Sequence, residues 1–530
     1  MSGERDSVGS DAPETVESSP RFVKRLGLVL GPLLAVVLLF APGVELEPVQ
    51  RRVAAVAALT ATYWITEAIP LAAASLLPVA LLPLLGALPA ETVAPPYMDD
   101  LVMLFLGAFL LALGLERWGV HKRMALAILS FVGPHPDRLV LGFLGATVCL
   151  SLWMNNTATA LLMLPIGLSV AGRVEPRGDA RAARDFPVAL ILAIAYGATF
   201  GGMGTPVGTA PNQVFLGHYA RMFPSAPPID FGAWVLGWLP MVIVLSLVAW
   251  WLLTRGVLRV RGVALGAREA IAAERAALGP AGRGERWMAA VFALTAVLWM
   301  TRGDLDLGFV RVPGWSRGLY LLTGGEPGDF AAHRRDVTDA TVALTMAVLC
   351  FLVPVDRKRG VHLLDWSVAK RVPWDVLLLI GGGFSLAEAF RQSQLDLVIG
   401  GALAPLFAGA SEWQVVAVLV VVVIFLSEIT SNTATANVFV PVFAQAAVAA
   451  GWNPLTIMAP VAIASSGGFM LPVSTPPNAL AYSTRRVPMA TMVRVGLILN
   501  LVMALLVCVC FELWVRRLWH IEPGLPVWAR

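Results

Sequence analysis

The sequence predicts an all-α polytopic membrane protein made of two related halves. Of its 530 residues, 57% are hydrophobic and only 14% are charged, and its mean hydropathy is +0.74. That composition is too apolar for a soluble protein of this length and is typical of a bundle of membrane-spanning helices. In addition, a polar stretch at residues 151–160, SLWMNNTATA, returns at residues 427–436 as SEITSNTATA.

Both polar stretches interrupt long apolar runs. In hydrocarbon, backbone that leaves the helix must be buried in protein or line a wet cavity, because unpaired polar groups are costly there. Each flanking arm is about 15 residues, roughly 22 Å as a helix, whereas the hydrocarbon core is about 30 Å thick. The pattern therefore predicts two re-entrant hairpins, at 138–172 and 414–448, with a single kinked span as the alternative for the first.

The charged residues and cysteines exclude several classes of function. The net charge is +4, but the basic residues lie at the ends of apolar runs, so we expect a lipid bilayer and no nucleic acid as partner. The four cysteines lie within apolar segments without metal-ligand spacing. No phosphate-binding glycine loop, His-Glu-x-x-His or Gly-x-Ser-x-Gly motif is present, so we expect no catalytic residues, no enzyme and no ATP-driven pump.

The chain begins with a polar segment followed by apolar runs. Residues 1–22 predict a disordered cytoplasmic tail, and 23–94 the first transmembrane helices. Arg21, Lys24 and Arg25 precede the first apolar run and place the N-terminus inside. No small-residue cleavage site follows that run, so we interpret it as a retained helix.

The region 95–254 repeats as 370–515. Besides the two hairpins, each copy contains a helix broken by a glycine-rich segment, predicted at 186–220 and 454–485. Six positions of these breaks match: Gly201/Gly467, Gly202/Gly468, Pro206/Pro472, Thr209/Thr475, Pro211/Pro477 and Asn212/Asn478. About five crossings separate the two copies, and an odd number gives them inverted topology.

Three segments lie outside the repeats. Residues 255–285, rich in Arg and Ala, predict a cytoplasmic connector. Residues 286–369 predict linking helices with an extracytoplasmic loop, and 516–530 a C-terminal tail.

Paired interruptions at corresponding places of two halves point to a transporter site at the midplane of the membrane. The free N–H groups and positive dipole end of a half-helix suit an anion, and unwound carbonyls, hydroxyls and amide oxygens suit Na⁺. Neither motif contains Lys or Arg, so neutral donors and co-bound cations must recognise the anion. The sequence thus predicts cation-coupled uptake of an anion with carboxylates at both ends. Hydrogen bonding between helices, worth about 1 kcal/mol, explains one copy better than it explains two.

At these residues the chain resembles the divalent anion/sodium symporter family, carriers of di- and tricarboxylates and sulfate. The resemblance rests on residues 64–71 (WITEAIPL), 431–433 (SNT) and 470–478 (MLPVSTPPN), and it extends over nearly the whole chain. It implies about eleven transmembrane helices, two re-entrant hairpins and a homodimer in the cytoplasmic membrane. It also implies a transport domain that moves as an elevator against a scaffold domain.

The resemblance also implies a set of site residues, matched by their positions in the motifs. The sodium ligands would be Ser151, Asn155, Asn156, Gly208, Ser427, Thr430, Asn432 and Ser474. The substrate carboxylates would meet Asn156, Thr157, Thr209, Asn432, Thr433, Thr475 and Pro476. Asn155 stands where the family usually has Ser, and its longer side chain changes the geometry expected of the first sodium site.

We therefore expect sodium-coupled symport of C4-dicarboxylates such as succinate, malate or fumarate, without an organic cofactor. A dicarboxylate exchanger, or a sulfate or citrate carrier of the same family, is the nearest alternative, and an anion channel is a more distant one. Four charged residues near apolar runs are interpreted as packing or gating residues: Glu67, Glu388, Arg391 and Glu428.

Overall fold

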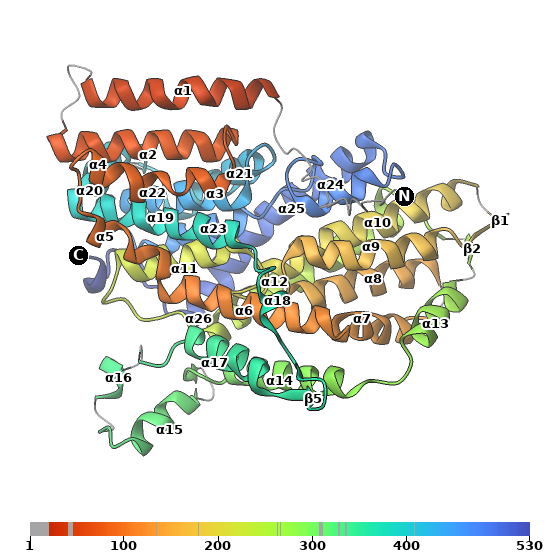
Figure 1. The fold of residues 1–530 in the computed structure, drawn as a ribbon. Helices are drawn as coiled ribbons and strands as arrows, with labels where there is room; N and C mark the ends of the chain where they lie inside the picture. The colour runs from red at the N-terminus through yellow and green to blue at the C-terminus, as the bar shows by residue number, and fades with distance from the viewer. Residues whose placement is uncertain are drawn as a thin grey trace, which may run out of the picture.

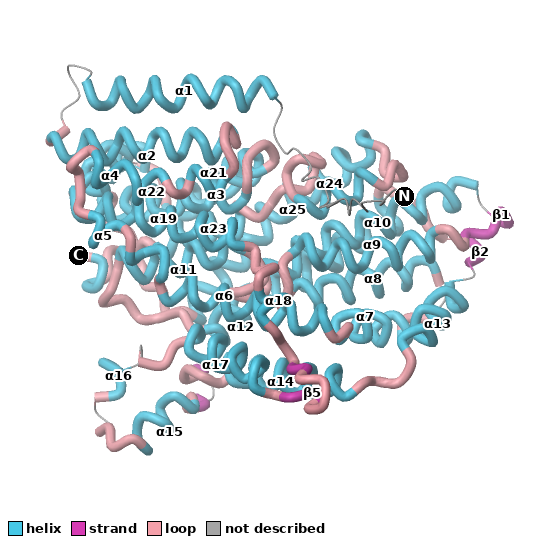
Figure 2. The backbone as a smooth tube through the Cα atoms, viewed as in Figure 1, coloured by secondary structure: helices cyan, strands magenta, loops and turns pink. Residues whose placement is uncertain are grey.

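The computed structural model describes residues 21–530 except 41–45, 134, 179, 262, 266, 307–310, 327–328, 334–335 and 408. The predicted N-terminal tail, apart from its last two residues, lies outside the described residues. Within them the protein is helical, and its strands form three two-stranded antiparallel ribbons in loops (Figure 2).

The N-terminal helices pack side by side at one edge of the molecule (Figure 1). The outermost helix, α1, packs along α2 and leaves most of its apolar side chains exposed, as a helix facing lipid would. The helices before the first repeat are α1 (Arg21–Phe40), α2 (Pro48–Thr66), α3 (Leu71–Ala74), α4 (Leu77–Leu84) and α5 (Ala90–Val93), followed by a 3₁₀ turn at Pro95–Met98.

In the first repeat, two 16-residue helices flank the polar stretch, and they lie side by side (Figure 1). Its broken helix ends at Met203 and resumes at Ala210. The helices are α6 (Asp100–Arg117), α7 (Val120–Phe131), α8 (Pro136–Ser151), α9 (Asn156–Ala171), α10 (Ala180–Met203), α11 (Ala210–Met222) and α12 (Phe231–Trp251), which ends in a π-turn at Leu252–Gly256.

The second repeat has the same order of elements. Its broken helix stops earlier, at Ala464, and resumes at Pro476. The helices are α18 (Trp366–Ala369), α19 (Trp374–Ser393), α20 (Leu395–Leu403), α21 (Glu412–Ser427), α22 (Asn432–Ala449), α23 (Leu455–Ala464), α24 (Pro476–Ser483), α25 (Met489–Cys510) and α26 (Arg516–Leu518), with a 3₁₀ turn at Ala404–Phe407 and a π-turn at Phe511–Val515.

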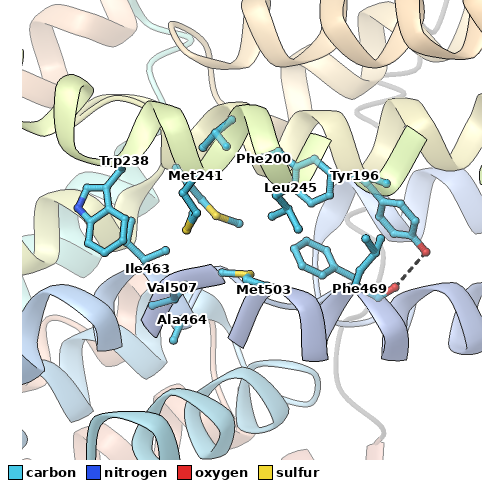
Figure 3. Close-up of a cluster of buried hydrophobic side chains, with 14 of the residues drawn as sticks. Tyr196, Phe200, Trp238, Met241, Leu245, Ile463, Ala464, Phe469, Met503 and Val507 are labelled. Carbon is cyan, nitrogen blue, oxygen red and sulfur yellow. Dashed lines mark hydrogen bonds between the residues drawn. The ribbon is translucent and has the colours of Figure 1, made fainter. Parts of the chain in front are cut away.

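The two repeats interlock through equivalent contacts. Helix α24 of the second repeat packs on α9 of the first, and α11 of the first packs on α22 of the second. The core between them is apolar: Tyr196 and Phe200 of α10 meet Phe469, and Met241 of α12 meets Met503 of α25 (Figure 3). Each broken helix is therefore held against the hairpin of the other repeat.

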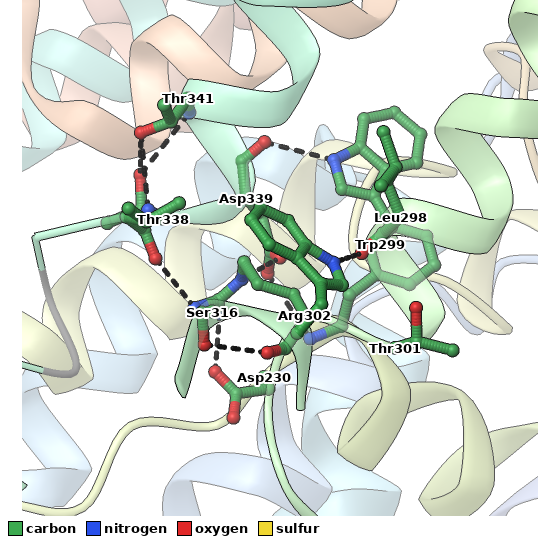
Figure 4. Close-up of polar contacts among 12 residues, drawn as sticks. Asp230, Leu298, Trp299, Thr301, Arg302, Ser316, Thr338, Asp339 and Thr341 are labelled. Atoms are coloured by element: carbon green, nitrogen blue, oxygen red, sulfur yellow. Dashed lines mark hydrogen bonds and ion pairs between the residues drawn. The ribbon is translucent and has the colours of Figure 1, made fainter. Parts of the chain in front are cut away.

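Between the repeats lie α13 (Ala267–Leu278), α14 (Arg283–Met300), α15 (Trp315–Leu322), α16 (Phe330–His333) and α17 (Asp339–Leu352). A buried ion cluster joins this region to α12, because Arg302 pairs with both Asp230 and Asp339 and also donates to the carbonyl of Val337 (Figure 4). Burial alone would lower the pKa of Arg302, but the two carboxylates outweigh burial and raise it.

Two features of the loops were not predicted from the sequence. The strands β1 (Val174–Gly178) and β2 (Val263–Leu265) pair the loop between α9 and α10 with the segment that follows α12. Two further ribbons, β3–β4 (Leu305–Asp306 with Arg311–Val312) and β5–β6 (Pro354–Asp356 with Val361–His362), are local hairpins. Non-local strand pairing leaves no periodic signal in so few residues.

The C-terminal segment also folds back onto the first repeat. Trp519 packs against Phe215 and Trp234, and Trp528 packs edge-on against Tyr219. A last 3₁₀ turn spans Val527–Ala529. The segment 516–530 therefore belongs to the packed core and is more than a tail.

Five helical segments among the described residues are long and apolar enough to cross a membrane: Arg21–Phe40, Ala90–Arg117, Ala180–Met203, Phe231–Gly256 and Met489–Leu518. Other apolar helices, such as α9 and α21, are shorter because the breaks cut them. About eleven transmembrane helices stays a prediction.

Candidate functional site

All seven predicted substrate residues lie at the start of a helix. Asn156 and Thr157 are the first two residues of α9, and Asn432 and Thr433 are the first two of α22. In the broken helices, Thr209 and Thr475 occupy the N-cap positions of α11 and α24, and Pro476 is the first residue of α24. The breaks thus expose four helix N-termini, which carry unpaired N–H groups and the positive end of the helix dipole.

Two predicted sodium ligands lie at helix C-termini, where carbonyl groups are left free. Ser151 is the last residue of α8, and Ser427 is the last residue of α21. Because the C-terminal end of a helix is the negative end of its dipole, it suits a cation. The hairpins therefore place a cation-favouring helix end next to an anion-favouring helix start.

The first break brings Ser151, Asn156 and Gly208 together. Ser151 Oγ lies 2.6 Å from the carbonyl oxygen of Ala198 and 3.0 Å from Asn156 Oδ1. A methyl group on Gly202 would come within 2.5 Å of Asn156 Oδ1, and one on Gly208 within 2.5 Å of the carbonyl oxygen of Gly202. Gly202 is therefore needed for the close approach of the broken helix to the hairpin tip, and Gly208 for the close approach of the unwound segment to Gly202.

Asn155 uses its side-chain oxygen within its own helix. Asn155 Oδ1 accepts a 2.7 Å hydrogen bond from the backbone N–H of Ala158 and caps α9. Ser431, at the equivalent position of the second tip, makes no side-chain capping bond. The structure thus gives the Asn155 side chain a capping function, and its predicted function as a sodium ligand stays a prediction.

The second break brings Ser427 and Ser474 together around Gly468. A methyl group on Gly468 would lie 2.8 Å from Ser474 Cβ and 3.3 Å from the carbonyl oxygen of Ser427. Ser427 is fully buried, and its hydroxyl has no hydrogen-bond partner among the described residues. A buried, unpartnered oxygen at this place fits a cation ligand.

The remaining predicted residues of the second site have different surroundings. The side-chain oxygen of Asn432 is buried without a hydrogen-bond partner in the described part of the chain, which also fits a ligand. The hydroxyl of Thr430 lies 2.7 Å from Thr435 Oγ1 and 2.9 Å from the carbonyl oxygen of Leu426. The Thr430 side chain is thus engaged within its own hairpin.

The asparagine that ends each break was not assigned a function from the sequence. Asn212 Nδ2 donates to the carbonyl groups of Gly202 and Thr205, and Asn478 Nδ2 donates to that of Gly468. Both asparagines are fully buried and hold the unwound backbone in place. In the sequence, the signal that could have indicated this function is that Asn212 and Asn478 occupy matched positions in the two repeats.

The helix starts at the two tips are accessible to small molecules. Asn156, Thr157, Asn432 and Thr433 are all partly exposed, whereas the residues behind them in α9 and α22 are largely buried. Because α24 packs on α9 and α11 packs on α22, each tip lies in a hairpin that contacts the broken helix of the other repeat. Each hairpin thus presents a partly exposed helix N-terminus, which favours an anion, beside a helix C-terminus, which favours a cation.

Comparisons with known proteins find relatives that match most of the chain. The profile of the sodium:sulfate symporter transmembrane region matches residues 21–521. A sodium-dependent dicarboxylate transporter SdcS of Staphylococcus saprophyticus is 38% identical over 491 residues, which cover 90% of this chain and 88% of that protein. Its Staphylococcus aureus counterpart is 37% identical over 496 residues, covering 91% and 89%.

Two solved structures share the fold at low sequence identity. The YdaH transporter of Alcanivorax borkumensis has a TM-score of 0.52 at 14% identity, covering 80% of this chain and 87% of that chain. MtrF of Neisseria gonorrhoeae has a TM-score of 0.55 at 13% identity, covering 82% and 85%.

Proposed function

Because this chain belongs to the sodium:sulfate symporter family, we propose that it is a secondary active transporter that imports C4-dicarboxylates such as succinate, malate or fumarate together with Na⁺. It is a multi-pass protein of the cell membrane. The observation that carries the substrate class is the 38% identity, over 90% of this chain, to a transporter named for sodium-dependent dicarboxylate transport.

The geometry of the breaks supports this chemistry. A dicarboxylate has a charge at each end, and two helix N-termini at the hairpin tips, α9 and α22, come from different repeats. Each carboxylate would accept hydrogen bonds from backbone N–H groups and from the Asn and Thr side chains at its tip. Sodium ions at the C-terminal ends of α8 and α21 would offset the charge of the anion.

The movement that we propose is an elevator. Both hairpins and both broken helices, which interlock in one body, would form the transport domain and slide against a scaffold built from the remaining helices. The repeats would be inverted, the hairpins re-entrant, and the protein a homodimer. These proposals rest on the repeat pattern of the sequence and on the family resemblance.

Uptake of labelled succinate into proteoliposomes tests the function. We expect uptake to follow an inward sodium gradient and to fall to the level of empty liposomes when choline replaces sodium. Undiminished uptake in choline would remove the sodium coupling.

A competition panel and a counterflow assay separate the alternatives within the family. Unlabelled malate and fumarate should compete with succinate, whereas stronger competition by sulfate or citrate would reassign the substrate. Uptake that requires dicarboxylate inside the vesicles would indicate an exchanger. Current that does not saturate with substrate would indicate a channel.

A further inference from the structure

A buried carboxylate lies beside the second cation group and has no counterpart in the first. Glu428 follows α21 and is 3% exposed. Its Oε1 accepts hydrogen bonds from the backbone N–H groups of Phe469 and Met470, both at 2.8 Å, and from Asn500 Nδ2 at 2.7 Å. Its Oε2 accepts a bond from the backbone N–H of Leu471 at 3.0 Å.

The partners of this carboxylate are all uncharged donors. Four N–H groups and no acceptor match a carboxylate, because an ionised carboxylate only accepts hydrogen bonds. No cationic side chain contributes to this hydrogen-bonded set. A buried charge without a paired cation is costly in a membrane protein, so its retention indicates a function.

The difference between the two broken helices explains where the donors come from. In the first repeat α10 remains helical to Met203, the position equivalent to Phe469, so its N–H groups are bonded within the helix. In the second repeat α23 stops at Ala464, and residues 465–475 are not helical. Successive N–H groups of unwound backbone form a concave anion-binding surface, and Glu428 fills it.

The first tip has Leu152 where the second has Glu428. Its surroundings use neutral groups instead: Trp234 Nε1 donates to the carbonyl oxygen of Met203, and Thr205 Oγ1 donates to that of Leu152. The first cation group is therefore built from neutral oxygens, whereas the second has a full negative charge beside it.

That charge lies next to the predicted ligands of the second group. Glu428 directly follows Ser427 in the sequence. The hydroxyl of Ser427 is buried and has no hydrogen-bond partner among the described residues. Gly468, which contacts Ser427 and Ser474, immediately precedes the first of the three N–H donors, Phe469. The carboxylate thus holds the backbone that brings these ligands together.

We propose that Glu428 is a positioning residue for the second cation. It holds residues 469–471 in their unwound conformation and supplies the fixed negative charge that draws Na⁺ to the group of Ser427 and Ser474. The second cation group consequently binds Na⁺ more tightly than the first. This inference rests on the proposed function, because it assigns one of the two cation groups of the symporter.

The test compares Glu428→Gln with Glu412→Gln in the full-length protein. Glu412 lies at the other end of α21 and pairs with Arg516, so the same chemical change is made far from both breaks. Sodium dependence is measured twice: as succinate uptake into proteoliposomes, and as the shift in melting temperature of the detergent-solubilised protein when NaCl replaces choline chloride.

For Glu428→Gln we expect the sodium concentration for half-maximal uptake to rise about tenfold, since a neutral amide removes the attraction of a nearby unit charge. The sodium-dependent thermal shift should weaken in parallel. Glu412→Gln should keep the wild-type sodium dependence. A Glu428→Gln protein with wild-type sodium dependence in both assays would overturn the inference.

The wild-type protein and a second variant, Asn500→Ala, separate the possible outcomes of this test. If the wild-type protein shows no sodium-driven uptake, the proposed function fails, and this result is distinct from a failure of the inference. If Glu428→Gln does not fold, Asn500→Ala removes one of the four donors and leaves the three backbone bonds. We expect Asn500→Ala to shift the sodium dependence about twofold in the same direction, and no shift would count against the inference.

Discussion

The two hairpin tips share Ser, Asn and Thr at corresponding positions and differ in the four residues between the Ser and the Asn. Both have Ser before the break and Asn-Thr after it. The residues between are Leu152, Trp153, Met154 and Asn155 in the first tip and Glu428, Ile429, Thr430 and Ser431 in the second. In the first tip, Trp153 enters a cage of aromatic rings; in the second, Ile429 is 62% exposed. The unrepeated residues Trp153 and Ile429 thus give the two tips different neighbours.

The aromatic cage ties the first tip to helices outside its hairpin. Trp153 stacks on Phe231 of α12 at 6.0 Å and on Trp299 of α14 at 6.4 Å, and it meets Phe292 of α14 edge-on at 5.3 Å between ring centroids. The second tip is tied internally, through Glu428 and the unwound segment after α23. One tip is therefore held by apolar packing against other helices, and the other by charge within its own repeat.

The largest expected effect on stability comes from replacing Arg302, whose carboxylate partners lie next to the aromatic cage. Asp339, a partner of Arg302, also accepts bonds from the backbone N–H of Phe231 and, through its carbonyl oxygen, from Trp299 Nε1. Arg302→Met removes a buried cation from the partly buried carboxylates of Asp230 and Asp339, so we expect a loss of about 3 kcal/mol of stability. Chemical unfolding in detergent measures it.

The control for Arg302→Met is Arg391→Met, which breaks the more exposed pair with Glu388. Pairs of that kind contribute at most about 1 kcal/mol, so Arg391→Met should change stability little. Equal losses for the two variants would show that the cluster does not support the cage.

The next effect concerns the residues that the tips share. We expect Asn156→Ala and Asn432→Ala each to lower sodium-driven succinate uptake about ten- to a hundredfold, because each would remove a predicted polar ligand worth about 1–3 kcal/mol. Uptake at saturating sodium and expression level are measured together. Ser246→Ala, in which a hydroxyl bonded within α12 is lost, serves as control and should keep wild-type uptake. Normal uptake in either Asn variant would show that the two tips are not equivalent in transport.

The residues that the tips do not share should show unequal effects. Trp153→Ala removes a partly buried ring from the aromatic cage, and we expect it to cost about 1–2 kcal/mol of stability. Ile429→Ala changes an exposed side chain and should stay within about 0.5 kcal/mol of the wild type. Both are read by thermal unfolding in detergent. A larger loss for Ile429→Ala would contradict the assignment of the cage to the first tip.

The sequence predicted the family, which the profile match confirms, because the ligand motifs are local and are repeated. It also located the breaks, since an Asn-Thr or a Thr-x-Pro-Asn segment inside an apolar run stands out from its neighbours. It did not reveal the Trp153 cage or the partners of Glu428. Those contacts join residues more than forty positions apart, for example Glu428 and Phe469, and no periodicity or spacing encodes them. The same reason applies to the β1–β2 ribbon and to the packing of Trp519 on α12.

The smallest effect is expected from Asn155→Ser, which gives the first tip the Ser-Asn-Thr sequence of the second. Asn and Ser are equally good N-cap residues, so stability should change by no more than about 0.5 kcal/mol. Because Asn155 Oδ1 is bonded to the N–H of Ala158, its replacement should leave the sodium dependence of uptake within about twofold of the wild type. Uptake measured across sodium and lithium concentrations checks this. A clear change in the preference for Na⁺ over Li⁺ would instead show that Asn155 contacts the cation, and the first tip would then differ from the second in its ligands as well as in its neighbours.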